Sequence, residues 1–278
     1  MMYLLLAVIS SAMVSVVMRL SEGRVRSKMG MLAANYLVCT ALAAAMTGTT
    51  ALFPREEGGA FALALGALSG ALYLAGFVAL QWNIHRNGGV LPAVFMKLGV
   101  MVPTLMAVIV FHETPGAAQA AGFAMALAAI WLIQAEGNGK RAASKMGLLA
   151  LLVVGGLSDS LAKMYEAWGS ARLSGHYLTY TFGFALLLCV LLCVVKKQAS
   201  APRDLLFGAV LGVPNYFSAR FLLWSLSEIP AVVAYPTYSI GAIVLVTLAG
   251  MALFHERLTR RQWIAMGLIL AALALLNL

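Results

Sequence analysis

The tripeptide Phe111-His112-Glu113 ends one apolar run of this chain, and the same tripeptide, Phe254-His255-Glu256, ends another run 143 positions later. A glutamine follows each glutamate by six positions, as Gln119 and Gln262. Upstream of each tripeptide, a five-residue stretch with glycine at both ends also recurs, at residues 66–70 and 208–212. A period this long is not that of a solenoid and indicates that the chain consists of two copies of one half.

The composition assigns both copies to a membrane. Hydrophobic residues make up 62% of the 278 residues, charged residues make up 10%, and the mean hydropathy is +0.92. The apolar residues form runs of roughly twenty, the length of an α-helix that crosses the hydrocarbon layer. We therefore predict an all-α integral membrane protein with ten transmembrane helices, at about 2–20, 29–48, 60–82, 89–111, 116–134, 145–165, 176–195, 204–226, 231–253 and 260–277.

The basic residues predict how these helices are oriented. A net charge of +9 could indicate nucleic acid, but most lysines and arginines lie in short loops, where they set topology, and no nucleic-acid partner is expected. Loops after even-numbered helices carry only Arg55 and Arg172. Loops after odd-numbered helices carry fourteen basic residues: Arg19, Arg24, Arg26, Lys28, Arg86, Lys140, Arg141, Lys145, Lys196, Lys197, Arg203, Arg257, Arg260 and Arg261. Both termini are therefore predicted to lie outside a bacterial inner membrane.

An odd number of helices per half gives the two halves opposite orientations. Residues 1–138 hold the first five helices and residues 139–278 hold the second five, so the second half enters the membrane upside down relative to the first. Such an inverted repeat has two nearly equivalent asymmetric states, each open to one side of the membrane. The pattern predicts a secondary transporter that works by alternating access.

The repeated tripeptide also carries a family resemblance. Two five-helix halves, each with an F-x-E helix end followed by a Q-x-x-G/A helix, resemble EamA-type members of the drug/metabolite transporter superfamily, most closely over 253–267. The resemblance implies a central cavity lined by helices one to four and six to nine. Known substrates of the family include amino acids, nucleotide sugars, phosphorylated sugars, nucleobases and drugs. Its termini are often cytoplasmic, whereas the loop charges here predict termini outside.

Charged residues inside a membrane helix are costly and usually face the bundle interior. Lys97 lies in the fourth predicted helix, between two prolines, and is predicted to bind an anionic substrate group or to titrate during transport. A structural ion pair, or snorkelling to the cytoplasmic edge, would also explain it. In the sixth helix, Asp159, Lys163 and Glu166 are spaced for an Asp159–Lys163 pair, with proton coupling by Asp159 as the alternative.

A second candidate group lies in the eighth predicted helix. Asn215, Tyr216 and Arg220 share one helix flank, which suits them to hydrogen-bond a polar substrate. The alternative is that Arg220 reaches the outer membrane–water interface, where Trp224 would belong to the belt of interfacial aromatic residues. Further candidates for the cavity wall, each of which could instead serve helix packing, are Tyr235, Tyr238, Asn35, Tyr36 and Tyr73.

These residues predict transport of a small polar metabolite, such as an amino acid or a related carboxylate- or phosphate-bearing solute, by a monomer or weak homodimer in the lipid bilayer. Neither a cofactor nor a metal nor an enzymatic reaction is expected. The two His-Glu pairs lack the second histidine of a zinc-binding H-E-x-x-H helix and are predicted to gate or to support structure. The rival function is a membrane-embedded enzyme acting on a lipid-linked substrate. The scattered histidines count against that rival: His85, His112, His176 and His255.

The predicted orientation can be checked with reporter fusions. Alkaline phosphatase fused after residue 278 is expected to be active, because that enzyme folds only outside the cytoplasm, and green fluorescent protein at the same position is expected to stay dark. A fusion after Lys140, in the basic loop between the halves, should behave in the opposite way. A fluorescent fusion after residue 278 would place the C-terminus in the cytoplasm and contradict the charge count.

Overall fold

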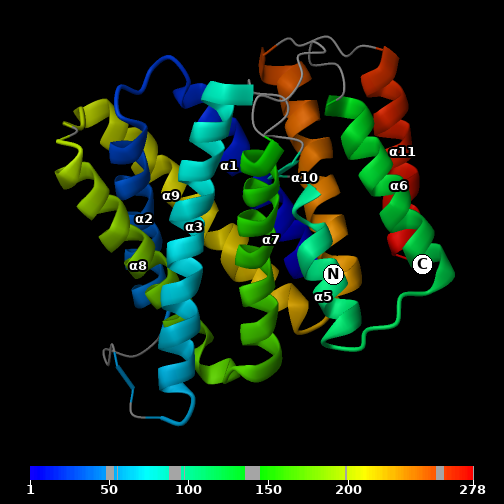
Figure 1. Cartoon of the computed structure of the whole chain (residues 1–278), viewed down its shortest axis with the longest axis horizontal. Helices are drawn as coiled ribbons and strands as arrows, with labels where there is room; N and C mark the ends of the chain where they lie inside the picture. The colour runs from blue at the N-terminus through cyan, green and yellow to red at the C-terminus, as the bar shows by residue number, and fades with distance from the viewer. Residues whose placement is uncertain are drawn as a thin grey trace. The chain divides into compact units, whose positions relative to one another are not determined.

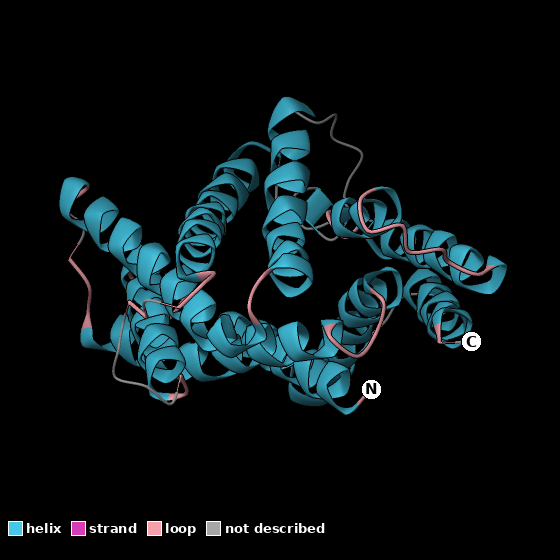
Figure 2. Ribbon diagram, turned by 90° about the horizontal axis from the view of Figure 1, so that it is seen from below, coloured by secondary structure: helices cyan, strands magenta, loops and turns pink. Residues whose placement is uncertain are grey.

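Helices are the only regular elements in the part of the chain that the computed structural model describes (Figure 2). That part comprises residues 1–47, 53–54, 56–87, 95–96, 98–134, 145–197, 199–254 and 260–277. Its elements, of which the α-helices are labelled in Figure 1, are α1 (Met2–Ser21), α2 (Lys28–Ala45), α3 (Gly59–Asn87), α5 (Met101–Ile109), α6 (Ala117–Gln134), α7 (Lys145–Trp168), the 3₁₀ helix η1 (Ala171–Leu173), α8 (Ser174–Val195), α9 (Pro202–Leu226), α10 (Ala231–Phe254) and α11 (Arg260–Leu276). Seven of these helices are long and apolar enough to cross a membrane, so this is a multi-pass membrane protein.

Hydropathy places most helix ends within a few residues of where the structure has them, and α7 and α10 begin at the predicted residues. The helix predicted at 89–111 is wrong as one continuous element, because its described part contains a turn at residues 99–100, and α5 runs from Met101 to Ile109. A second difference is α3, which continues to Asn87 where the prediction ends at 82. Within this extension, the Nδ2 group of Asn83 donates hydrogen bonds to the carbonyls of Ala79 (2.8 Å) and Gly147 (2.9 Å). A polar side chain whose donors are satisfied by backbone carbonyls can be buried at low cost, so the helix does not have to end there.

The described helices form two compact units, and each unit draws on both halves of the sequence. We call Met2–Leu74 with Leu161–Trp224 the α2–α8 unit, and Ala75–Ser160 with Ser225–Leu278 the α6–α11 unit. The boundaries between them fall inside α3, α7 and α9. This partition does not test the division of the sequence at residue 138, which stays a prediction, as does the inverted repeat.

Close backbone contacts hold the α2–α8 unit together. Helices α2 and α8 pack against each other, and α3 and α9 each add to this pair through glycines (Figure 1). Gly66 and Gly70 of α3 face α8, whereas Gly208 and Gly212 of α9 face α2, where a Cβ on Gly212 would lie 2.8 Å from the carbonyl oxygen of Asn35. The third helix of each predicted half thus packs on the second helix of the other predicted half.

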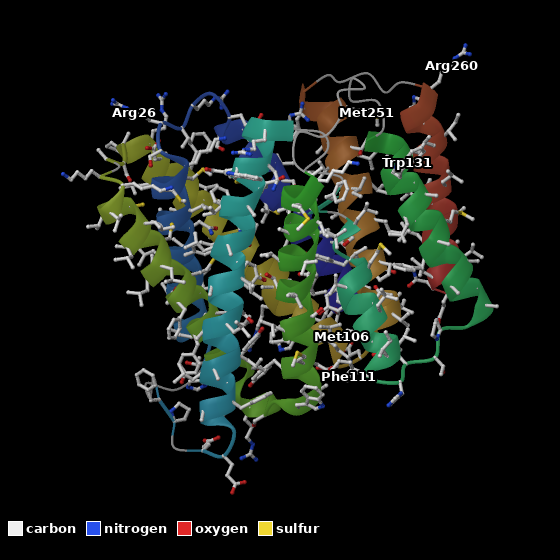
Figure 3. The ribbon with its side chains drawn as sticks, in the orientation of Figure 1. Arg26, Met106, Phe111, Trp131, Met251 and Arg260 are labelled. Carbon is white, nitrogen blue, oxygen red and sulfur yellow. The ribbon has the colours of Figure 1, made fainter. Side chains whose placement is uncertain are left out.

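A buried carboxylate joins the N-terminal ends of α2 and α9. Asp204, which is fully buried in the first turn of α9, accepts hydrogen bonds from the backbone N–H groups of Ala201 (2.9 Å), Arg26 (2.9 Å) and Ser27 (3.0 Å). The Arg26 side chain lies at the same end of α2 (Figure 3). Ser27 caps α2 by accepting the N–H of Gly30 at 3.1 Å. The α1–α2 connection is therefore fixed to the start of α9.

In the α6–α11 unit, α6 and α11 pack against each other, and α10 packs on both of them and on α5. Two glycines of these helices differ in their surroundings. Gly122 of α6 faces α11, with its Cβ position 3.0 Å from the carbonyl oxygen of Ala272, but a Cβ on Gly267 of α11 would meet no described atom within 4 Å. Gly122 therefore allows a close helix contact, and Gly267 lies in open space. Trp131, on the outer side of α6, is 62% exposed (Figure 3).

A matched pair of glycine substitutions tests the packing. Gly212→Ala is expected to destabilise the protein by about 1–3 kcal/mol, because the added methyl group overlaps the backbone of α2. Gly267→Ala adds the same group in open space, so it should gain up to about 1 kcal/mol of helix propensity. Thermal unfolding in detergent, at one scan rate, measures both. Equal losses for the two variants would rule out close packing at Gly212 as the cause.

Candidate functional site

Arg220 is a buried cation in α9. Its side chain is 8% exposed, its Nη1 donates to the Oγ of Ser174 at 3.4 Å, and its Cζ lies 4.5 Å from the centre of the Trp224 ring. Its Nε is buried and has no hydrogen-bond partner in the described part of the chain, where no carboxylate lies within ion-pair distance of the guanidinium either. A buried charge without a counter-charge is costly, so this group is suited to bind an anion.

Aromatic rings surround the start of this flank of α9. Phe182 of α8 is fully buried, and three predicted site residues contact its ring: Tyr36 (centroids 6.5 Å apart), Tyr73 (6.1 Å) and Tyr216 (6.3 Å). The hydroxyl of Tyr216, one turn before Arg220, is buried and finds no hydrogen-bond partner among the described residues. The structure therefore gathers these three tyrosines in one unit, around a phenylalanine that the sequence did not single out.

Two predicted asparagines meet between α2 and α9. The Nδ2 of Asn215 donates to the Oδ1 of Asn35 at 3.2 Å, and Cys39 lies against both, with its Sγ 3.7 Å from the Asn215 amide. Cys39 also donates to the carbonyl of Gly212 at 3.2 Å. Asn35 is 1% exposed, so its amide needs partners of this kind inside a membrane helix. The flank of α9 thus presents Asn215 to α2 and Arg220 to the start of α8.

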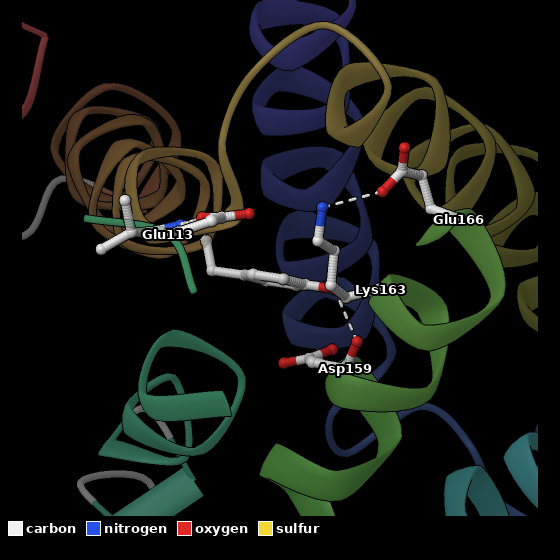
Figure 4. Close-up of polar contacts among 6 residues, drawn as sticks. Glu113, Asp159, Lys163 and Glu166 are labelled. Atoms are coloured by element: carbon white, nitrogen blue, oxygen red, sulfur yellow. Dashed lines mark hydrogen bonds and ion pairs between the residues drawn. The ribbon is translucent and has the colours of Figure 1, made fainter. Parts of the chain in front are cut away.

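Figure 4 shows contacts of the charged group predicted in α7, Asp159, Lys163 and Glu166. Lys163 forms an ion pair with Glu166 at 2.8 Å, and both side chains are largely buried. The backbone carbonyl of Asp159 accepts the hydroxyl of Tyr235 at 2.6 Å, which ties α7 to α10 within the α6–α11 unit. Tyr238, one turn further along α10, is half-buried. The contact of Asp159 is through its backbone, so proton coupling by its side chain stays a prediction.

Glu113, from the first Phe-His-Glu, caps a neighbouring helix. Its Oε2 accepts the backbone N–H of Val232 at 2.9 Å, in the first turn of α10 (Figure 4). His112 adopts a left-handed backbone (φ 53°), and the N–H of Glu113 bonds the carbonyl of Ala107, so the chain reverses direction directly after α5. A carboxylate at a helix N-terminus is favourable because it satisfies free N–H groups and opposes the helix dipole. This contact gives Glu113 a structural role.

Some predicted residues lie outside the described part of the chain: Lys97, His255 and Glu256. The sequence reasoning missed Asp204, although Pro202-Arg203-Asp204 is a typical helix start with an acid in the first turn. It also missed Ser174, because a single serine outside any motif does not indicate a binding site. Within the described ranges, no group of three or more His, Cys, Asp and Glu residues is placed to hold a metal ion.

Comparison with known proteins decides the family. The model of the EamA-like transporter family matches residues 146–278. A protein of Klebsiella pneumoniae (strain 342), described as probable 4-amino-4-deoxy-L-arabinose-phosphoundecaprenol flippase subunit ArnE, is 35% identical over 103 residues, which cover 34% of this chain and 90% of that protein. The chain belongs to the EamA-like transporter family.

Two further likenesses extend over most of this EamA-like chain. An uncharacterised protein of Haemophilus influenzae (strain ATCC 51907 / DSM 11121 / KW20 / Rd) is 27% identical over 228 residues, which cover 79% of this chain and 75% of that protein. A solved crystal structure superposes with a TM-score of 0.78 at 14% identity and covers 99% of this chain and 94% of its own. At that identity the superposition shows a shared fold alone.

The cap on α10 of this EamA-like protein can be tested directly. Glu113→Ala removes the acceptor of the Val232 N–H and is expected to lower the free energy of unfolding by about 1 kcal/mol. Glu113→Gln keeps an acceptor oxygen and should lose less. Glu57→Ala, at an exposed glutamate, is the control and should be neutral. If the Glu113 and Glu57 variants melt alike in a thermal unfolding assay, the cap contributes nothing to stability.

Proposed function

We propose that this EamA-like protein is a secondary transporter of the bacterial inner membrane that moves a small metabolite bearing a carboxylate or phosphate group. Transport occurs by alternating access, in a monomer or weak homodimer with both termini outside. The observation that carries the proposal is the buried guanidinium of Arg220, which has no carboxylate partner among the described residues.

The energetic argument concerns the charge of Arg220. An ionised group inside a membrane span is retained where it binds a substrate, an ion or a partner charge. Stacking on Trp224 and one long hydrogen bond to Ser174 offset only part of the cost of dehydration. A substrate anion would supply the missing counter-charge, and the neighbouring amides of Asn35 and Asn215 could bind its polar groups.

Two observations support alternating access by exchangeable halves. The glycine contacts of α3 on α8 and of α9 on α2 are the same contact with the halves exchanged, as an inverted repeat requires. The match with the ArnE relative takes up 34% of this chain but 90% of that relative, which fits a structural unit smaller than the whole of this chain. The name of that relative describes the flipping of a phosphate-bearing lipid, and a phosphate has the charge sign that Arg220 would select.

The rival proposal, an enzyme acting on a lipid-linked substrate, is less well supported. The family model and the ArnE relative are both named for moving a substrate. The acids and histidines of the described residues are dispersed, and Glu113, Glu166 and Asp204 are each engaged in a structural contact. A lipid-linked anion nevertheless belongs among the candidate cargoes, because the same guanidinium would bind its phosphate.

A thermal-shift screen of the full-length protein in neutral detergent tests the charge of the cargo. Amino acids, sugar phosphates, nucleobases and organic cations are compared at equal ionic strength. An anionic or zwitterionic ligand at a hundred times its Kd should stabilise the wild type by about 2.7 kcal/mol, because it binds only the folded state. Arg220→Gln should abolish this stabilisation.

Two controls make the screen decisive. Arg172→Gln removes an exposed cation from η1 and should leave the ligand response intact. Counterflow of the stabilising ligand into proteoliposomes should be seen with the wild type and be at least tenfold slower with Arg220→Gln. Stabilisation by organic cations alone, or an undiminished response of Arg220→Gln, would show that the cargo is not bound through an anionic group at Arg220.

A further inference from the structure

The first turn of α8 is capped without a side chain. Leu173, at the N-cap position, makes no side-chain cap hydrogen bond, and the N–H of Ser174 donates to the carbonyl of Ala171 in η1. The first N–H groups of a helix have no partners within it, and they carry the positive end of the helix dipole. Over the 22 residues of α8 that dipole is fully developed, so its N-terminus attracts negative charge.

Arg220 points at this helix end. Its Nη1 contacts the Oγ of Ser174, the first residue of α8, while its Nε has no partner in the described part of the chain. A guanidinium that is more than nine-tenths buried thus faces the positive end of a helix. Cations are stabilised at helix C-termini and disfavoured at N-termini, so the arrangement gains energy only when an anion lies between the two.

The nearby charges of the same unit do not supply that anion. Glu166, on the last turn of α7, is paired with Lys163 at 2.8 Å. Arg172, in the 3₁₀ turn just before α8, adds a further positive charge and is exposed. The polar groups that remain available, including the buried hydroxyl of Tyr216 one turn from Arg220, are hydrogen-bond donors suited to oxygen atoms.

We propose that Arg220, Ser174 and the first turn of α8 form a binding site for a phosphate group. This rests on the proposed function and deepens it by naming the receptor of the anion. The Nε and Nη groups of an arginine donate to two oxygens of one centre, the hydroxyl of Ser174 can donate to a third, and the helix dipole favours the negative charge. A tetrahedral phosphate uses all of these donors, whereas a planar carboxylate has only two oxygens to offer.

Trp224 provides an optical readout, because its ring stacks on the guanidinium. In the full-length protein the other four tryptophans are replaced by phenylalanine. Inorganic phosphate is then added stepwise at constant ionic strength while the fluorescence of Trp224 is recorded. A saturable change is expected with phosphate, and acetate should bind at least tenfold more weakly. Arg220→Gln should weaken phosphate binding at least tenfold, and Arg172→Gln less than twofold. Acetate binding as tight as phosphate binding, or equal losses in the two arginine variants, would overturn the proposal.

A substitution at Ser174 tests the helix terminus itself. Ser174→Asp places a carboxylate at the first position of α8, beside Arg220, so it should raise the melting temperature and abolish the phosphate response. Ser174→Asn, which adds similar bulk without charge, should keep phosphate binding within about threefold. If Ser174→Asp binds phosphate as the wild type does, α8 is not part of the receptor. That result would leave the proposed function intact, because anion selectivity by Arg220 is measured separately in the ligand screen.

The phosphate could belong to a soluble solute or to a lipid. The same titration is therefore made with inorganic phosphate and with short-chain phosphatidic acid. If inorganic phosphate binds saturably and phosphatidic acid does not displace it, the site is one for a soluble solute. Competitive displacement by phosphatidic acid supports the same site with a lipid headgroup as its occupant. A wild type that responds to neither probe, while Trp224 still reports folded protein, would overturn the proposal.

Discussion

Glycine at a few helix positions is the constraint on which the α2–α8 unit depends. A membrane offers no water to satisfy backbone or side-chain groups, so polar residues must find partners on neighbouring helices at short range. Gly212 allows α9 to approach α2 closely enough for Asn215 to bond Asn35, and for Cys39 to reach the carbonyl of Gly212 itself. Larger side chains there would separate the helices and deprive the buried amide of Asn35 of its bond to Asn215.

The same approach of helices sets the position of Arg220. Because α9 is held against α2 along its first half, its second half carries the guanidinium towards the start of α8, where Ser174 lies. Two other buried charges of this unit have partners within the protein. Lys163 pairs with Glu166, and Asp204 accepts hydrogen bonds from three backbone N–H groups. Lys163 and Arg220 are the buried lysine and arginine of the described residues, and Arg220 lacks such a carboxylate, which is why its charge is informative about a ligand.

The two repeated glycine stretches are alike in packing, but the residues around them differ in chemistry. At the repeat offset of 142 given by the glycines, Gly208 and Gly212 correspond to Gly66 and Gly70, but Arg220 corresponds to Val78 and Asp204 to Ala62. The glycines at both places allow a close helix contact. The buried charges have no such constraint, since Arg220 and Asp204 correspond to apolar residues at this offset.

The sequence by itself determined the helices, their approximate ends and the family, because hydropathy and repeated motifs are properties of local stretches. It also placed Arg220, Asn215 and Tyr216 on one flank of α9, since helical periodicity follows from residue spacing alone. Only the tertiary structure decided the partner of each polar group. Arg220 meets Ser174 across 46 positions, Asn215 meets Asn35 across 180, and Glu113 meets Val232 across 119. Such contacts depend on how helices pack, and no local pattern encodes the packing.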